Sequence, residues 1–351
     1  MALIDPADLT FNGEDARSMS DAVIETIFEN PAVTDLMTVY DGIVAKKQIP
    51  FLGILSKITK ADAGCGQGQT AKNIPMTEKF WEPEAVKIWL TMCGSEVDDS
   101  FWVFAQNTGV DRDNVTGTDI ARFVVDRMSS AAQEDLLRII WFNDTAHDNV
   151  SGSGVIKNGV SLADYTIIDG LWKQIFAIVA TTAARKTAIA KNALSTYALQ
   201  MALGTSDALD TFRKMIEASD PRLNAAPNKF FIATRSLVEN YAAYLESQGN
   251  STSFERIENG YVMLRYRGIP VFGFDFWDRT IQADMQNGTK YDLPHRAVLT
   301  VKENLAVGYD AANAVGDFRV WYSEDTELNN FKGKYRVDAK VLQDYMIQVA
   351  Y

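Results

Sequence analysis

The sequence is poor in the residue types that metal sites and many catalytic sites need. Among 351 residues there are two cysteines, Cys65 and Cys93, and two histidines, His147 and His295. Neither histidine has a partner at metal-binding spacing, and the sequence contains no HExxH, CxxC or Cys/His cluster. We therefore expect no metal site and no cofactor. So few cysteines give no sign of an oxidising compartment, and we expect a reduced, intracellular protein.

Long apolar runs and an excess of positive charge are also missing. No stretch approaches the roughly 20 apolar residues of a membrane helix, so we expect no membrane partner. The N-terminal residues MALIDPADLTFNGED have neither the basic start nor the apolar run of a signal peptide. The net charge of -12 argues against a protein that grips nucleic acid along its length. It fits either simple solubility or a surface that lies near nucleic acid without binding it.

Familiar catalytic motifs are incomplete. The glycine-rich run at 64–68 has neither P-loop nor dinucleotide-binding spacing, and SGSGV is not a GxSxG nucleophile elbow. Asp111 begins a run that lacks the glycine and closing glutamate of a calcium loop. His147 lies near Asp144 and Asp148, as a carboxylate-oriented general base would. We favour a solvated loop histidine and predict no catalytic residue; the alternative is a hydrolase around Asp144, His147 and Asp148.

What is present is globular composition with clear hydrophobic spacing. The contents of 47% hydrophobic and 23% charged residues are ordinary, and this length forms one large domain or two smaller ones. Val86, Ile88 and Leu90 alternate as in a strand, within a glycine-punctuated segment at about 48–100 that we expect to be a projecting hairpin. A capping box at Thr116 and Asp119 predicts a long helix that ends at about residue 141.

The second half of the chain alternates helical and strand patterns. Helical spacing covers 164–179, 183–203 and 207–217, KFFIA at 229–233 indicates a buried strand, Thr234 begins another helix, and strands flank Gly268. At 317–322 and 334–341, apolar residues alternate with polar or charged ones. This alternation is typical of antiparallel strands with one buried and one wet face. Together the patterns predict an α+β fold.

Large aromatic residues cluster around the predicted hairpin. A thin hairpin has little core in which to bury them, so we expect them to pack on a neighbouring subunit. The candidate intersubunit contacts are Trp81, Trp89, Phe101 and Trp102.

The order of these parts resembles that of the major capsid proteins of tailed phages, which have the Hong Kong 97-type shell fold. That order is a short N-terminal arm, a projecting hairpin, one long helix, a mixed α/β lobe and a return to long antiparallel strands. The likeness covers most of the chain in layout. The segments that carry it are IIDGLWKQI at 167–175, RGIPVFG at 267–273, PHRAVLTVKENLAVGYD at 294–310, DFRVWYSED at 317–325 and KYRVDAKVLQDYMIQVAY at 334–351.

The resemblance implies a division of the chain into named parts. It implies an N-terminal arm at 1–47, an E-loop at 48–100 and a P-domain with a spine helix at 101–154. It also implies an A-domain at 155–293, after which residues 294–351 return through the A-domain into the C-terminal strands of the P-domain.

The resemblance also implies a function. A phage subunit of this kind self-assembles into pentamers and hexamers of an icosahedral head, in the host cytoplasm, and encloses double-stranded DNA without sequence-specific binding. The hairpin begins by about residue 48, so we expect a separate scaffolding protein, together with a portal protein. No motif marks Lys79 or Lys87 for covalent crosslinking, and we predict none. The second hypothesis is an encapsulin-type nanocompartment subunit, which shares the fold and encloses a cargo enzyme.

Overall fold

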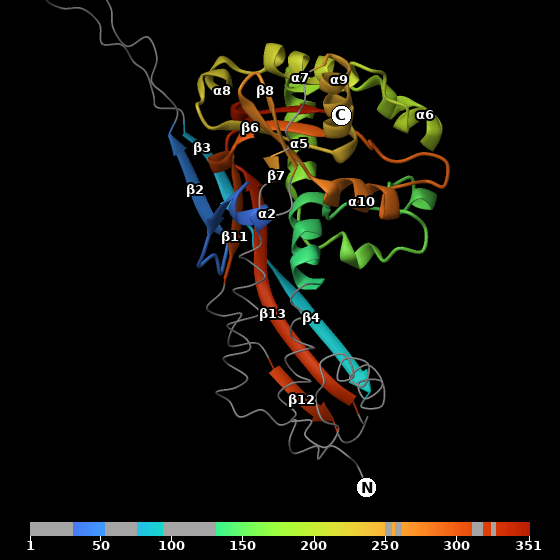
Figure 1. Cartoon of the computed structure of the whole chain (residues 1–351). Helices are drawn as coiled ribbons and strands as arrows, with labels where there is room; N and C mark the ends of the chain where they lie inside the picture. Colours follow the sequence, from blue (N-terminus) through green and yellow to red (C-terminus); the bar gives the residue numbers. More distant parts are fainter. Residues whose placement is uncertain are drawn as a thin grey trace, which may run out of the picture.

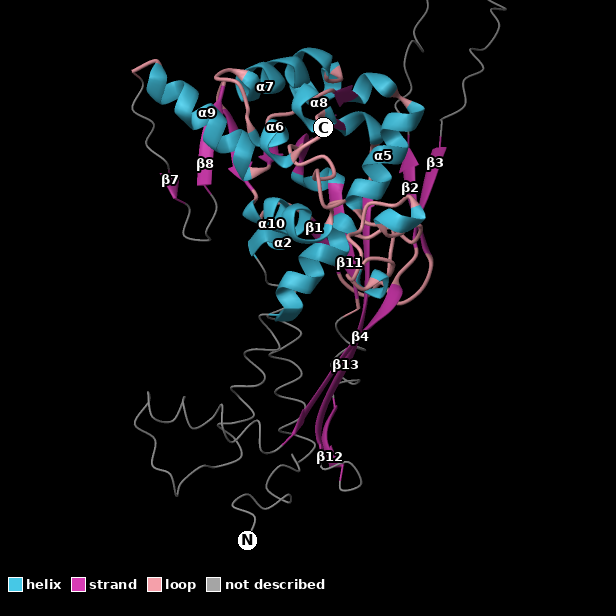
Figure 2. Ribbon diagram, turned by 90° about the vertical axis from the view of Figure 1, so that its right-hand side faces the viewer, coloured by secondary structure: helices cyan, strands magenta, loops and turns pink. Residues whose placement is uncertain are grey.

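The computed structural model of the chain describes residues 31–52, 76–93, 131–249, 255–256, 262–310, 319–323 and 328–351. These residues form two regions (Figure 1). One is a body in which helices pack around a sheet. The other is a long, narrow sheet that begins within the body and extends well beyond it (Figure 2).

The body is built on a seven-stranded, mostly antiparallel sheet. Its centre is apolar on both sides, because helices cover both faces. Alternate residues of one central strand therefore enter different cores: Phe230 and Ile232 join one hydrophobic cluster, and Phe231 and Ala233 join the other. From one edge to the other, the strands are β5 (Lys186–Thr187), β14 (Ile347–Ala350), β10 (Ala297–Val301), β6 (Lys229–Ala233), β9 (Ile269–Gly273), β8 (Val262–Tyr266) and β7 (Glu255–Arg256).

Different helices cover the two faces of this sheet. Helices α7 (Asp207–Ala218) and α9 (Arg235–Ser247) pack on the face that holds Phe231. Helix 131–142, α5 (Leu171–Thr181) and α10 (Asp275–Asp284) cover the face that holds Phe230. The shorter helices are α2 (Pro31–Thr34), α6 (Tyr197–Met201), α8 (Pro221–Ala225) and the 3₁₀ turns Val150–Gly152, Leu162–Asp164, Ala183–Arg185, Ala190–Ala193, Lys302–Asn304 and Asp344–Met346.

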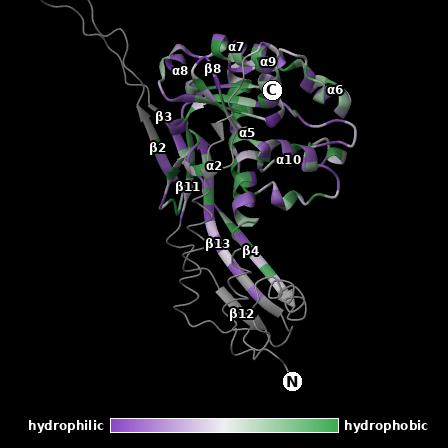
Figure 3. Cartoon of the chain, viewed as in Figure 1, coloured by the Kyte–Doolittle hydropathy of each residue, from purple (hydrophilic) through white to green (hydrophobic). Residues whose placement is uncertain are grey.

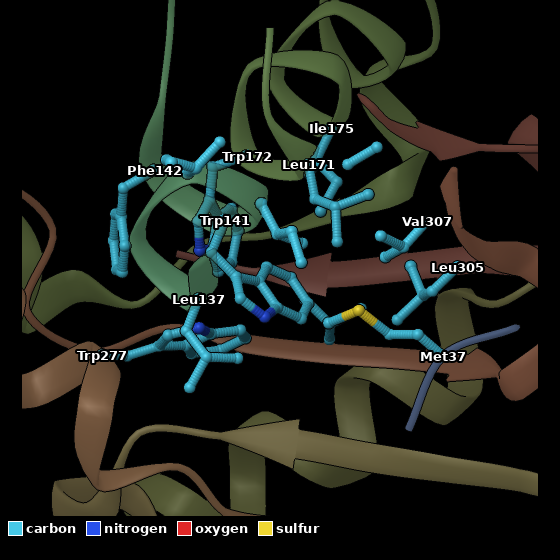
Figure 4. Packing of buried hydrophobic residues seen from close by; sticks show 14 of the residues in the cluster. Met37, Leu137, Trp141, Phe142, Leu171, Trp172, Ile175, Trp277, Leu305 and Val307 are labelled. Atoms are coloured by element: carbon cyan, nitrogen blue, oxygen red, sulfur yellow. The ribbon is translucent and has the colours of Figure 1, made fainter. Parts of the chain in front are cut away.

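Three tryptophans form the centre of the core that contains Phe230 (Figure 4). Trp141 ends helix 131–142, Trp172 lies on α5 and Trp277 lies on α10; all three are buried. The ring centroids of Trp141 and Trp277 are 4.6 Å apart, and those of Trp172 and Trp277 are 5.0 Å apart. Met37, which follows α2, reaches the same cluster. Edge-on aromatic packing thus joins three helices, and Met37 brings the start of the described chain into the same core.

The narrow sheet is organised by one long strand. β13 (Leu328–Val341) has 14 residues and is therefore about 45 Å long. Its C-terminal part pairs with β11 (Leu305–Tyr309), which pairs in turn with β1 (Thr38–Tyr40) inside the body. Beyond the body, β12 (Arg319–Ser323) pairs with the N-terminal part of β13, and β4 (Glu84–Cys93) pairs along its other edge. We call β4, β12 and β13 the ribbon.

A separate hairpin lies against the base of the ribbon. It consists of β2 (Lys47–Leu52) and β3 (Met76–Trp81), which are antiparallel. Hydrophobic residues concentrate inside the body, whereas β13 shows mixed character along its outer part (Figure 3). The ribbon is therefore a sheet with one covered face and one wet face, as its alternating sequence predicts.

After β10 the chain crosses between the two sheets twice, and one side chain holds both of these crossings. Asn304, which lies between β10 and β11, donates from Nδ2 to the Met346 carbonyl oxygen at 3.2 Å. Its Oδ1 accepts from the Gln343 backbone N–H at 2.6 Å. Both residues belong to the connection from β13 to β14, so the buried Asn304 fixes how the two sheets join.

Most predicted elements are confirmed where the structure describes them. The KFFIA strand, the strand around Ile88, the strands that flank Gly268 and the helices near 207–217 and 235–247 are all present. Residues 131–142 are helical, as predicted, while the capping box lies outside the described residues.

Three predictions are wrong in detail. Strand β4 pairs with β13 instead of extending the hairpin. The alanine-rich stretch 183–203 holds short turns, the two-residue strand β5 and α6 instead of one helix. The chain does not end in the ribbon, because β14 returns to the seven-stranded sheet. In addition, α10 was not predicted, since residues 269–277, IPVFGFDFW, read as one continuous strand.

Candidate assembly surface

The wet face of the ribbon gathers cations around an exposed tryptophan. In the β4–β13 register, Lys87 lies opposite Lys334 and Trp89 lies opposite Lys332. Paired residues point to the same side of a sheet, and so do residues two apart on one strand. The side chains of these residues therefore share one face. We call Lys87, Trp89, Lys332 and Lys334 the lysine face.

Trp89 is the apolar centre of this face. Its side chain is 52% exposed, and its indole N–H donates to Asn330 Oδ1 at 3.3 Å. The Lys87 ammonium lies 3.6 Å from a ring centroid of Trp89, and the Lys332 ammonium lies 5.8 Å away. A cation over an exposed indole contributes about 0.5–1 kcal/mol. This pairing holds the ring in place and leaves much of it open to solvent.

The three lysines of this face repel one another. The pKa of the Lys87 ammonium is lowered by partial loss of solvent and by the charges of Lys332 and Lys334. Within the described part of the chain, no carboxylate lies at ion-pair distance from these three lysines. Like charges placed opposite each other destabilise a sheet by a few tenths of a kcal/mol or more. The lysine face is therefore suited to receive an anionic partner.

The opposite face of the ribbon is covered near the body. Val86, Tyr335 and Val337 are buried there and belong to the same core as helix 131–142 and α5. Leu90, farther out on β4, is 40% exposed. The covered face therefore becomes more exposed away from the body, and the ribbon offers apolar surface as well as charge.

The base of the hairpin of β2 and β3 packs on the narrow sheet, on the same side as the lysine face and nearer the body. Trp81 is 4% exposed and packs with Ile43 and Ala306. A Cβ atom on Gly308 would lie 2.9 Å from the Trp81 ring, so the indole lies directly on the backbone of β11. The Lys79 ammonium donates to the Val341 carbonyl oxygen at 2.6 Å and to Asp344 Oδ1 at 2.7 Å.

A buried carboxylate joins the hairpin to β13. Asp338 Oδ2 accepts from the Glu82 backbone N–H at 2.7 Å, and the Lys340 ammonium lies 3.3 Å from the same oxygen. Burial raises the pKa of Asp338 to about 6, and Lys340 and the backbone N–H groups limit that rise. The pKa of this carboxyl group lies above its ordinary range because burial between the strands removes water from it.

The predicted contact residues have different surroundings. Trp81 contacts its own chain, and its side chain has almost no surface left for a neighbouring subunit. Trp89 is exposed and remains a predicted contact, while Phe101 and Trp102 lie outside the described residues. No local sequence pattern marks Lys332 as a contact residue, and strand alternation places Lys334 only on a wet face. Their meeting with Lys87 depends on the β4–β13 register, which no local sequence pattern encodes.

The hydrolase alternative finds no support in the geometry. His147 Nε2 lies 2.9 Å from the Phe142 carbonyl oxygen, and no side-chain hydrogen bond joins His147 to either aspartate. Asp144 accepts from the Lys173 ammonium at 2.8 Å, and Asp148 accepts from the backbone of Asn149 at 2.8 Å. Each carboxylate is thus bound to a different partner, and neither orients the imidazole.

The other histidine is part of a buried network. His295 Nδ1 lies 2.7 Å from Ser236 Oγ, and Nε2 lies 2.9 Å from the Gln200 carbonyl oxygen. Burial lowers the pKa of His295 and favours the neutral ring. The described residues contain no group of three or more His, Cys, Asp or Glu residues that could hold a metal ion. None of the described helices is both long enough and apolar enough to cross a membrane.

Comparison with solved structures identifies the fold. A chain of the satellite phage P4 procapsid, a particle that includes the size determination (Sid) protein, matches with a TM-score of 0.57 and 11% identity over 94% of this chain and 90% of that chain. A chain of Gordonia phage Cozz matches with a TM-score of 0.50 and 13% identity over 90% and 84% of the two chains. These likenesses confirm the predicted α+β fold of the Hong Kong 97 type.

A chain of the SrpI encapsulin complex from Synechococcus elongatus is also similar, with a TM-score of 0.48 and 12% identity over 90% of this chain and 85% of that chain. No family model matches the sequence, and no curated protein matches it either.

Proposed function

We propose that this chain is the major capsid protein of a tailed phage, a structural subunit and not an enzyme. The observation that carries the proposal is the fold, shared with a chain of a phage procapsid over 94% of this chain. The shape suits the role, because a compact body with a projecting ribbon presents different surfaces on different sides. Heterologous contacts between such surfaces, repeated by rotation, close into rings.

The proposed parts of the subunit follow the two regions. In this proposal the A-domain (155–293) contains most of the seven-stranded sheet, and the P-domain (101–154) includes helix 131–142, which shares a core with the inner part of the ribbon. The hairpin of β2 and β3 forms the described part of the E-loop (48–100), and α2 and β1 belong to the N-terminal arm (1–47). In this proposal two domain boundaries shift. We assign β4 to the P-domain because it pairs with β13, and β14 to the A-domain because it pairs with β10.

The assembled product that we propose is an icosahedral shell of pentamers and hexamers that encloses double-stranded DNA. The net charge of -12 supports enclosure without tight binding, since like charges repel. The proposed location is the virion capsid, with assembly in the host cytoplasm. A separate scaffolding protein and a portal protein are the proposed partners.

Electron microscopy of the purified recombinant chain tests this function. We expect rings or closed shells, and a stable, monodisperse monomer at high concentration would contradict the proposal. Expression together with the neighbouring genes distinguishes the encapsulin alternative: shells that retain a cargo enzyme instead of DNA would favour it. Denaturing electrophoresis of the particles should show a single band at the mass of one subunit, without a covalent ladder.

The hydrolase alternative has its own test. Replacing Asp144, His147 and Asp148 together with alanine should leave particle formation unchanged. Loss of a hydrolytic turnover that the unmodified chain possesses would instead support an enzyme.

A further inference from the structure

The lysine face carries positive charge that needs an anionic partner. Lys87, Lys332 and Lys334 are grouped around Trp89 in a chain whose net charge is -12. No carboxylate of the described residues neutralises them. A charge-complementary partner would remove their mutual repulsion.

The first thirty residues carry a large share of the negative charge of the chain. They contain seven acidic residues and one basic residue, a net charge of -6 and thus half of the total. Apolar residues accompany these acidic residues. Met19, Val23 and Ile27 follow one another at intervals of four positions, and Asp21 and Glu25 have the same spacing. The charged residues of this segment are Asp5, Asp8, Glu14, Asp15, Arg17, Asp21, Glu25 and Glu29.

The position of α2 favours a neighbour over the same chain. Val33, Leu36 and Met37 are buried in the core on the covered side of the narrow sheet, where Met37 lies near Trp141 (Figure 4). The lysine face is on the opposite side, since Lys334 alternates with the buried Tyr335 along β13. The acidic segment therefore joins the body on the side away from its own lysine face. Thirty residues reach at most about 100 Å, which is enough to meet another copy.

We propose that the lysine face of one subunit binds the acidic segment of residues 1–30 of a neighbouring copy of this chain. The inference rests on the proposed shell function, which supplies the neighbouring copy. Carboxylates of the segment pair with Lys87, Lys332 and Lys334, and its apolar residues cover the exposed ring of Trp89. Double-stranded DNA is a less suitable occupant, because the remainder of an acidic subunit repels it. The contact is exposed, so it weakens as the salt concentration rises.

Crosslinking within assembled particles tests the contact directly. Particles are assembled from equal amounts of isotope-labelled and unlabelled full-length chain and treated with a carbodiimide, which joins carboxylates to amines without a spacer. We expect peptides from residues 1–30 crosslinked to peptides that contain Lys87, Lys332 or Lys334. Pairs with one labelled and one unlabelled partner show contact between copies. Crosslinks of uniform labelling alone would place the segment on its own chain and overturn the proposal.

Charge reversal gives the matched comparison. Lys87→Glu, Lys332→Glu and Lys334→Glu together should abolish these crosslinks and raise the subunit concentration needed for assembly about tenfold. Reversing Asp21, Glu25 and Glu29 to lysine in the same chain should restore both. The control variant carries the same change of net charge at three exposed lysines of the body, Lys157→Glu, Lys214→Glu and Lys290→Glu, and should behave like the unmodified chain.

The outcomes separate this inference from the proposed function. Particles that lack mixed crosslinks overturn the inference and leave the shell function standing. An unmodified chain that forms neither rings nor shells overturns both. If the lysine reversal instead removes binding of a short DNA duplex while no mixed crosslink forms, the face binds nucleic acid and the proposal fails. Thermal melting followed by circular dichroism confirms that each variant is folded, and a Lys→Gln series at the three lysines replaces any variant that is not.

Discussion

The body and the ribbon use the same residue type in opposite ways. In the body, Trp141, Trp172 and Trp277 are buried against one another between three helices. In the ribbon, Trp89 is 52% exposed, and lysine side chains lie over its ring. The body has helices on both faces of its sheet, whereas the outer ribbon is a single layer among the residues that the structure describes. Burial of large aromatic rings therefore stabilises the body, and we propose that the exposed ring of the ribbon serves contacts with other molecules.

The largest expected effect tests the role of the body. Trp141→Ala should lower the free energy of unfolding by about 3–5 kcal/mol, because it removes a buried ring from the centre of a packed cluster. Chemical denaturation followed by circular dichroism measures the change. A loss below about 1 kcal/mol would show that the cluster does not hold the three helices together.

The second effect concerns the buried carboxylate where ribbon and hairpin meet. The pKa of Asp338 is raised from 3.8 to about 6, so the folded chain binds its proton more tightly than the unfolded chain does. The stability gained from this proton is fully present below about pH 4 and is lost as the pH rises through about 6. The shift of about two pH units corresponds to roughly 3 kcal/mol.

Asp338→Asn removes this titration. Between about pH 4 and pH 7, the unfolding free energy of the variant should fall less than that of the unmodified chain, by up to roughly 3 kcal/mol. Urea denaturation across this pH range measures the difference. Asp278 in the body is a matched case, since burial raises its pKa to about 6 while it accepts from the Arg235 backbone N–H. If the unfolding free energies of both Asn variants and the unmodified chain changed equally with pH, the raised pKa values of Asp338 and Asp278 would be contradicted.

Local sequence predicted the elements of the body much better than their partners. KFFIA forms β6, as predicted, because a short apolar run between polar residues is typical of a buried strand. The stretch 183–203 has helical composition, yet buried side chains override it. Asn192 hydrogen-bonds the backbone of His295, and Gln200 hydrogen-bonds the Asn192 and Tyr291 carbonyl oxygens. The bonds to His295 and Tyr291 join positions about a hundred residues apart, which periodicity does not record.

The candidate surface was predictable in part for the same reason. A thin projecting element implies exposed aromatic rings, and Trp89 is indeed exposed. The same reasoning is misleading for Trp81, because the hairpin base packs on Gly308, which lies more than two hundred positions away in the sequence. The lysine face likewise depends on a strand register between distant segments. Composition indicates which residues are suited to a surface, and only the pairing of strands decides which of them meet.

A smaller effect tests how firmly the hairpin base is attached to the sheet. Gly308→Ala places a Cβ atom 2.9 Å from the Trp81 ring and should cost about 1–3 kcal/mol of unfolding free energy. Gly273→Ala is the control, because its added Cβ would have only ordinary contacts, the nearest at 3.5 Å to Val238. Thermal melting of both variants measures the effect. Equal melting temperatures would show that the indole moves aside without cost.

The smallest expected effect on stability carries the most information about the ribbon. Trp89→Ala removes a ring that is 52% exposed, so the free energy of unfolding should change by less than about 1 kcal/mol. Particle assembly should nevertheless be impaired, since the ring is the apolar centre of the lysine face. Melting temperature and electron microscopy on the same sample separate the two properties. Normal particles would remove Trp89 from the assembly contact, whereas a large loss of stability would show that the ribbon, like the body, uses its tryptophan for its own folding.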